Sequence, residues 1–125
     1  MPEVLALPML FDAVQARFEA ETTQGRIKFH EWIGDSYAVL FSHPKDSTPV
    51  CTTEFMTFAS MQDEFAELNT KLVGLSVDGL YSHIAWLRTI KDKIEFNGMK
   101  DVEVTFPLIE DITMNVAEKY GMIMP

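Results

Sequence analysis

Three apolar runs along the chain predict buried strands. They cover residues 37–41, 71–77 and 102–109. Continuous apolar runs are typical of strands that are covered on both faces of a sheet. Pro107, within the third run, predicts a kink or an edge position there, because proline cannot donate a ladder hydrogen bond.

Segments of different periodicity lie before and between these runs. Polarity alternates weakly over residues 18–22 and 26–29 on either side of Thr23-Gln24-Gly25, which predicts a hairpin. Residues 1–17 have no clear period, and we expect them to be irregular or weakly helical. From Glu54 onward, apolar residues three or four positions apart predict a helix that packs on the sheet: Phe55, Phe58, Met61, Phe65 and Leu68.

Two further helices are predicted downstream. One covers about residues 81–96, with Tyr81 and Ile84 on its apolar side, and Asn97-Gly98 ends it. A short one covers about residues 112–120. Strands that alternate with helices predict an α/β fold with a mostly parallel sheet, in which chemistry gathers at the carboxyl ends of the strands.

Composition narrows the function classes. The 125 residues suffice for one domain, and a content of 47% hydrophobic residues allows a packed core. The net charge of −9 argues against nucleic acid and against an anionic membrane surface as partners. The first residues have no basic region before their apolar stretch, so they do not predict a signal peptide. A single cysteine allows no internal disulfide and suits a reducing, cytoplasmic compartment.

That cysteine lies in an unusual loop. Ser47 or Thr48 suits a helix N-cap, and Pro49 suits the first helical position. Cys51 then falls in the first turn of a helix, where unpaired N–H groups stabilise a thiolate. The hydroxyl of Thr48, three residues earlier, can reach the sulfur or a substrate oxygen.

Other residues of the loop can serve the same site. Pro44 shapes the loop and shields one side, Glu54 can orient groups around the sulfur, and His43 can approach it. Structural roles stand beside these: Cys51 as a buried thiol, His43 as a strand-end residue bonded to backbone, and Glu54 as a favourable anion in a first helical turn. His30, His43 and His83 are not at ligand spacing, and with one cysteine they predict no zinc site. The sequence implies no metal or organic cofactor.

The loop resembles the active-site loop of the peroxiredoxins, whose signature Pro-x-x-x-Thr/Ser-x-x-Cys is met by Pro44, Thr48 and Cys51. The string HPKDSTPVCTTEF is similar to the one-cysteine, peroxiredoxin-6-type branch, and so are LVGLSVDGLYSHIAWLRTI and TFPLIEDITMNVAEKYGM. The resemblance covers about residues 18–125 and implies a thioredoxin-like fold: a central mixed sheet flanked by helices. We therefore expect residues 1–125 to be the amino-terminal portion of a single peroxiredoxin domain, without its carboxyl-terminal strands and helix.

The resemblance also implies roles for the loop residues. Cys51 is the peroxidatic cysteine, which attacks a peroxide oxygen as thiolate and becomes a sulfenic acid. Thr48 hydrogen-bonds substrate oxygen and sulfur, and Pro44 screens the site from water. Glu54 helps to hold an arginine, and His43 lies near the sulfur. The implied partners are hydrogen peroxide and small hydroperoxides, an external thiol reductant, and further copies of the chain in a homodimer or larger oligomer.

Departures from the family pattern bear on activity. Ser47 stands where the branch usually has Phe, and residues 11–16 lack the usual Gly-Asp and Pro. The family's active-site arginine would follow Pro125, and Arg88 is in the wrong segment to replace it. Without the later strands we expect residues 37–41 to form an exposed apolar edge and activity to be weakened. The alternative function is a non-catalytic thioredoxin-like interaction module, or pseudo-enzyme.

Overall fold

The computed structural model describes residues 4–7, 9–11, 18–43, 46 and 49–120. Over these residues the chain forms seven strands and five helices, in the order β1 (Val4–Leu7), β2 (Met9–Phe11), β3 (Glu19–Thr22), β4 (Gly25–Lys28), α1 (Phe29–Ile33), β5 (Tyr37–Ser42), α2 (Pro49–Ser60), α3 (Gln62–Glu67), β6 (Thr70–Ser76), α4 (Leu80–Lys93), β7 (Leu108–Glu110) and α5 (Asn115–Lys119).

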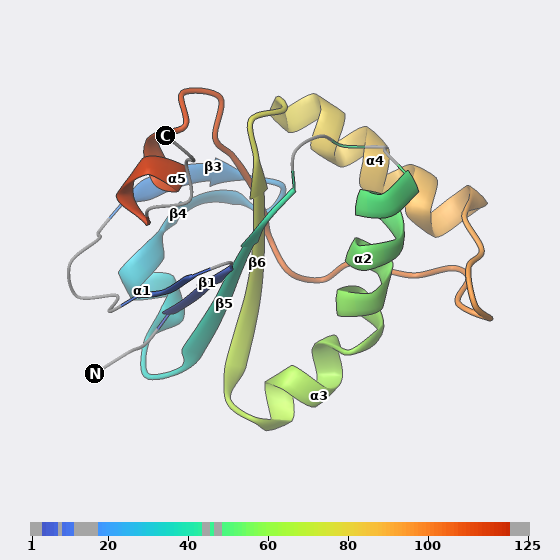
Figure 1. Ribbon diagram of the computed structural model, residues 1–125, viewed down its shortest axis with the longest axis horizontal. Helices are drawn as coiled ribbons and strands as arrows, with labels where there is room; N and C mark the ends of the chain where they lie inside the picture. The colour runs from blue at the N-terminus through green and yellow to red at the C-terminus, as the bar shows by residue number, and fades with distance from the viewer. Residues whose placement is uncertain (1–3, 8, 12–17, 44–45, 47–48, 121–125) are drawn as a thin grey trace.

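The strands form one mixed sheet in the order β2-β1-β5-β6-β7-β3-β4 (Figure 1). Strands β1, β5, β6 and β7 run parallel, and β2 and the β3–β4 hairpin add antiparallel strands at the two ends. The predicted α/β fold, with a central mixed sheet flanked by helices, is confirmed. Since β5 and β6 end at the same edge, the residue after β5 meets β6: the N–H of His43 donates to the carbonyl of Leu75 over 3.1 Å.

Both faces of β5 are covered, which explains its continuous apolar run. Ala38 and Leu40 belong to one buried cluster, and Val39 and Phe41 belong to another on the opposite face. Figure 1 shows α1 and α5 on one side of the sheet and α2, α3 and α4 on the other. We call the first the α1/α5 face and the second the α2/α4 face.

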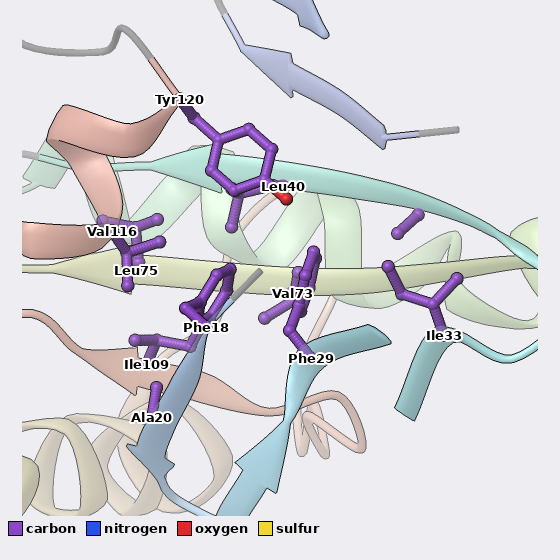
Figure 2. Close-up of a cluster of buried hydrophobic side chains, with 11 residues drawn as sticks. Phe18, Ala20, Phe29, Ile33, Leu40, Val73, Leu75, Ile109, Val116 and Tyr120 are labelled. Atoms are coloured by element: carbon purple, nitrogen blue, oxygen red, sulfur yellow. The ribbon is translucent and has the colours of Figure 1, made fainter. Parts of the chain in front are cut away.

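The α1/α5 face is an aromatic and aliphatic core. The rings of Phe18 and Phe29 stack with centroids 4.4 Å apart, and the ring of Tyr120 meets both edge-on at 6.0 and 6.1 Å. Figure 2 shows these side chains gathered against β5 and β6 together with Val116 of α5. Burial raises the pKa of Tyr120 above its usual range.

The N-terminal segment differs from the prediction. Val4–Leu7 and Met9–Phe11 form strands rather than irregular or helical chain. Strand β1 runs beside β5, from the pair Val4–Ala38 to the pair Leu7–Phe41. The expectation that residues 37–41 would form an exposed edge is therefore wrong, because the backbone of β1 pairs with that side of β5.

The third apolar run forms a much shorter strand than predicted, Leu108–Glu110. The backbone just before it is held by a side chain of α3 instead of a neighbouring strand. Gln62 donates to the carbonyl of Glu103 over 2.8 Å and accepts from the N–H of Thr105 over 3.0 Å. Pro107, which has no N–H, lies directly before the strand.

The first long predicted helix is interrupted. It divides at Met61 into α2 and α3. As a result Met61 and Leu68 are 38% and 70% exposed, so their assignment to the sheet-facing stripe is wrong. Phe55 is buried and Phe58 and Phe65 are half-buried against the same core, as predicted.

The remaining elements follow the sequence with small shifts. The hairpin is confirmed as β3–β4, but Phe29 begins the unpredicted helix α1. Helices α4 and α5 are confirmed with shorter bounds. Of the predicted apolar stripe, Ile90 is buried, as expected, but Tyr81 is 88% exposed. Helix α4 also turns His83 and Trp86 to the core. In the described part of the chain, no helix has the length and apolarity needed to cross a bilayer.

Candidate active site

Cys51 lies in the first turn of α2, as the sequence predicts. The helix begins at Pro49, so Cys51 is its third residue. Backbone N–H groups in a first helical turn have no partner within the helix and favour a negative charge close to them. Cys51 is 6% exposed, and in the described residues it is a free thiol.

A cavity of about 260 Å³ opens beside the sulfur-bearing residue. Its walls come from the end of β5 and from α2, and the lining residues are Phe41, Ser42, His43, Cys51, Glu54, Phe55 and Phe58. The volume exceeds that of a single water molecule and is sufficient for a small ligand. Three of the predicted site residues, Cys51, His43 and Glu54, thus share one cavity.

The predicted site residues differ in burial. His43 is buried, with 7% of its surface exposed, whereas Glu54 is exposed at the rim. Pro44 and Thr48 lie outside the described residues, as does Ser47, so their predicted roles remain predictions.

A buried polar cluster adjoins the cavity. The Nε2 atom of His43 lies 2.5 Å from Oδ1 of Asp46, and Nδ1 of His83 lies 2.6 Å from Oδ2 of the same carboxylate. The hydroxyl of Ser82 donates to Oδ2 over 2.9 Å. The N–H of Asp46 itself donates to the carboxylate of Asp78 over 2.5 Å. Asp46 is thereby tied to the segment that follows β6.

These contacts set the charge of Asp46. Burial alone would raise the pKa of this carboxyl group, but hydrogen bonds from His43, His83 and Ser82, together with the charge of His83, lower the pKa well below its usual value. Asp46 is therefore a carboxylate in the folded protein throughout the neutral range.

Aromatic rings close the inner side of the site. The ring of His43 lies 4.8 Å from the ring of Trp86, which in turn lies 4.7 Å from the ring of Phe55. The Nε1–H of Trp86 donates to the hydroxyl of Thr52 over 3.0 Å. Trp86 is buried, with 2% of its surface exposed. Its hydrogen bond ties α4 to the residue that follows Cys51.

The cluster also has the composition of a cation site. Ligand atoms of His43, Asp46 and His83 lie within 4.8 Å of one another, although their separation along the sequence predicted no such group. The hydrogen bonds within the cluster account for this geometry without an ion. We assign no metal ligand to it.

Sequence reasoning missed Asp46 and His83 as members of the site. Asp46 follows His43 by three residues, within reach across a turn, and this was a usable signal. His83 lies 37 residues from Asp46 in the chain. Only the pairing of β5 with β6 brings the first turn of α4 to the loop after β5.

Comparison with known proteins agrees with this geometry. The chain matches the AhpC/TSA family over residues 11–125. It is 57% identical over 119 residues to a peroxiredoxin of Methanosarcina mazei, covering 95% of this chain and 54% of that protein. It is 44% identical over 118 residues to human peroxiredoxin-6, covering 94% of this chain and 51% of that protein.

Solved structures give the same picture. A yeast mitochondrial one-cysteine peroxiredoxin is 46% identical, with a TM-score of 0.76 over 86% of this chain and 48% of that one. A mutant of peroxiredoxin 6 from Arenicola marina is 38% identical, also with a TM-score of 0.76, over 90% of this chain and 49% of that one. The chain spans about half the length of these relatives. Its sequence, its thioredoxin-like fold and the position of Cys51 together establish that the chain belongs to the AhpC/TSA family and is similar to the one-cysteine peroxiredoxins.

Proposed function

We propose that this chain carries the reactive site of a thiol peroxidase that reduces hydrogen peroxide and small organic hydroperoxides. The observation that carries the proposal is Cys51 in the first turn of α2, on the wall of a cavity of about 260 Å³. A thiol that is buried among packed side chains on every side would have no room for a second reactant. Here the cavity provides that room next to the helix terminus.

The reaction follows from the chemistry of the thiolate. The Cys51 sulfur attacks the terminal oxygen of the peroxide, so that an S–O bond forms while the O–O bond breaks. The leaving alkoxide or hydroxide takes up a proton and departs as alcohol or water. Cys51 is oxidised by two electrons to sulfenic acid, and the peroxide is reduced by two.

An external thiol is proposed to complete the cycle, on the strength of the similarity to a one-cysteine peroxiredoxin; a cycle closed by a resolving cysteine is the alternative. That thiol forms a mixed disulfide with Cys51 and releases water, and a second thiol restores Cys51 as a disulfide leaves. Thr48 is proposed to hydrogen-bond the substrate oxygen and Pro44 to screen the loop from water. Glu54, on the exposed rim of the cavity, is proposed to orient groups that approach Cys51.

The substrates, the reductant, the oligomeric state and the compartment are also part of the proposal. The relatives named peroxiredoxin support peroxides as substrates and an external thiol as reductant. We propose a homodimer or larger homo-oligomer, and a reducing, cytoplasmic compartment suited to a free thiol.

Peroxide consumption by the chain tests the proposal. The chain is mixed with hydrogen peroxide or a small organic hydroperoxide in the presence of a small thiol, and peroxide loss is followed beside a Cys51→Ser control. Consumption that depends on Cys51 and is first order in peroxide supports a peroxidase. If the wild-type chain consumes peroxide no faster than the Cys51→Ser control, the chain is the non-catalytic module instead. The same assay beside a full-length relative tests the expectation of weakened activity.

A further inference from the structure

His83 faces a hydrogen-bond acceptor from each of its two ring nitrogens. Nδ1 lies 2.6 Å from a carboxylate oxygen of Asp46, and Nε2 lies 3.0 Å from the backbone carbonyl of Ile109. Carboxylate and carbonyl oxygens only accept hydrogen bonds. With Asp46 ionised, both contacts are hydrogen bonds only when both nitrogens carry a proton, so the geometry favours the imidazolium form of His83. Its side chain is fully buried, and the carboxylate is its counter-charge.

His43 faces the same carboxylate with one nitrogen only. Nε2 lies 2.5 Å from Oδ1 of Asp46, so Nε2 carries the proton of that hydrogen bond. Nδ1 is buried and has no hydrogen-bond partner among the described residues. A proton on this second nitrogen would be a buried donor without an acceptor, which is costly. The favoured state of His43 is therefore neutral, with the proton on Nε2.

Other polar groups surround the cluster. Ser82 donates to Asp46 and so supports its ionised form. The carboxylate of Asp78 accepts the N–H of Asp46, and that of Glu110 accepts the N–H of Leu80 at the start of α4. Asp46 and His83 form a balanced pair, whereas the carboxylates of Asp78 and Glu110 add negative charge nearby. The neutral assignment of His43 therefore rests on its unpartnered Nδ1.

We infer that Asp46 and His83 are positioning residues for His43: as a buried carboxylate–imidazolium pair they hold His43 in its Nε2–H tautomer and leave Nδ1 as an unprotonated acceptor. Because His43 and Cys51 line the same cavity, the tautomer sets whether the buried Nδ1 atom next to this cavity is a proton acceptor or a donor. The inference deepens the proposed peroxidase function and rests on that function for its consequence at Cys51.

The pair acts on reactivity without touching the sulfur. Nδ1 is enclosed in the folded chain and contacts no hydrogen-bond partner among the described residues; once a small movement of the ring brings it to the cavity, the unprotonated atom can accept a hydrogen bond from the Cys51 thiol or from a peroxide hydroxyl. If the proton moved to Nδ1, the same ring would lose this ability. A correctly placed acceptor contributes roughly 100-fold or more to a reaction that requires proton transfer, and its partial loss costs correspondingly less.

Nitrogen-15 NMR of the histidine side chains tests the inference directly, because the ring nitrogen shifts separate imidazolium, Nδ1–H and Nε2–H forms. In the wild-type chain at pH 7 we expect one imidazolium ring, His83, and one neutral Nε2–H ring, His43. A His30→Gln variant assists assignment. A neutral His83, or a His43 with its proton on Nδ1, would overturn the inference, and this measurement needs no variant at the cluster to fold.

Substitution of the carboxylate tests the link to Cys51. In Asp46→Asn we expect His83 to become neutral, His43 to sample the Nδ1–H form, and the alkylation rate of Cys51 by iodoacetamide to fall about tenfold. Asp63→Asn makes the same chemical change at an exposed position of α3 and should leave both ring spectra unchanged. His83→Gln, which removes the imidazolium, should also redistribute the proton of His43.

The outcomes separate the two proposals. Unchanged ring spectra and alkylation in folded Asp46→Asn would refute the positioning role, whatever the peroxide assay gives. The expected ring forms together with a Cys51 that alkylates but does not reduce peroxide would uphold the tautomer assignment and refute the peroxidase function. If Asp46→Asn does not fold, the ring spectrum of the wild-type chain and that of His83→Gln still decide whether the positioning role is correct.

Discussion

The two faces of the sheet are built from the same strands but differ in what they bury. On the α1/α5 face, alternate residues of β5 and β6 pack against Phe18, Phe29 and Tyr120 in a core that is almost entirely apolar. On the α2/α4 face, the neighbouring positions pack against α2 and α4, and the end of that face holds the cavity and the buried cluster around Asp46. The first face therefore contributes stability mainly through apolar packing, while the second combines packing with a buried cluster of polar side chains that require specific partners.

Removal of one buried aromatic ring from each face is the strongest test of this difference between the faces. Phe29→Ala and Phe55→Ala both remove fully buried rings and should each lower the free energy of unfolding by about 3–5 kcal/mol in urea titrations. Only Phe55→Ala should also raise the alkylation rate of Cys51, since Phe55 lines the cavity. An equal effect of both variants on alkylation would contradict the separation of the faces.

A smaller effect is expected where the sheet meets the helices of the α2/α4 face. A Cβ atom at Gly74 would lie 2.6 Å from Cδ1 of Leu108 and 3.2 Å from the ring of Phe55. Gly74→Ala should therefore lower the free energy of unfolding by about 1–3 kcal/mol, because a well-packed core resists added volume. Gly79→Ala, where nothing lies within 4 Å of the added atom, should cost less. Equal losses of stability in the two variants would show that the core adjusts to the added Cβ atom at Gly74 without a loss of free energy.

The loss of a single buried hydrogen bond should lower stability by a smaller amount. Trp86→Phe keeps a ring but removes the donor to the hydroxyl of Thr52. We expect a loss of about 1 kcal/mol in the free energy of unfolding. Trp32→Phe, a half-buried position on the α1/α5 face, is the matched control and should change stability less. A larger loss of stability in Trp32→Phe than in Trp86→Phe would show that the tryptophan with the larger contribution to stability lies on the α1/α5 face.

The smallest expected effect is a loss of stability in acid that arises from Asp46 and is absent at neutral pH. The pKa of Asp46 is lower in the folded chain than its ordinary value of 3.8, so the folded state binds this proton less readily than the unfolded state. Its contribution to stability is complete above the ordinary value and is lost as pH falls through the folded one. Urea titrations from pH 6 downward should show a decline below about pH 4 that is weaker in Asp46→Asn. Equal declines in the two proteins would contradict this account.

The sequence predicted the parts of the fold that depend on local pattern. The apolar runs at residues 37–41 and 71–77 became β5 and β6, and the helix beginning at Pro49 placed Cys51 as expected. Prediction failed where tertiary contacts decide. Residues 102–107 are strongly β-forming but are held by Gln62, and the strand at Val4–Leu7 exists through its pairing with β5.

The candidate site shows the same division. Cys51, His43 and Glu54 were predicted from a continuous loop and share one cavity. His83 could not be placed there from sequence, because its partner Asp46 is brought to it by the order of strands in the sheet. A histidine at a helical position facing the core appears in sequence as a packing residue until the carboxylate that it meets is known.

The most direct test of the central claim is the mass of the chain after a single exposure to hydrogen peroxide without any thiol. The account predicts that one oxygen atom is gained at Cys51 as sulfenic acid, that a sulfenic-acid reagent captures it, and that the Cys51→Ser chain gains nothing at that position. Loss of peroxide with Cys51 unmodified, or a wild-type chain that stays unoxidised while its thiol remains alkylatable, would contradict it.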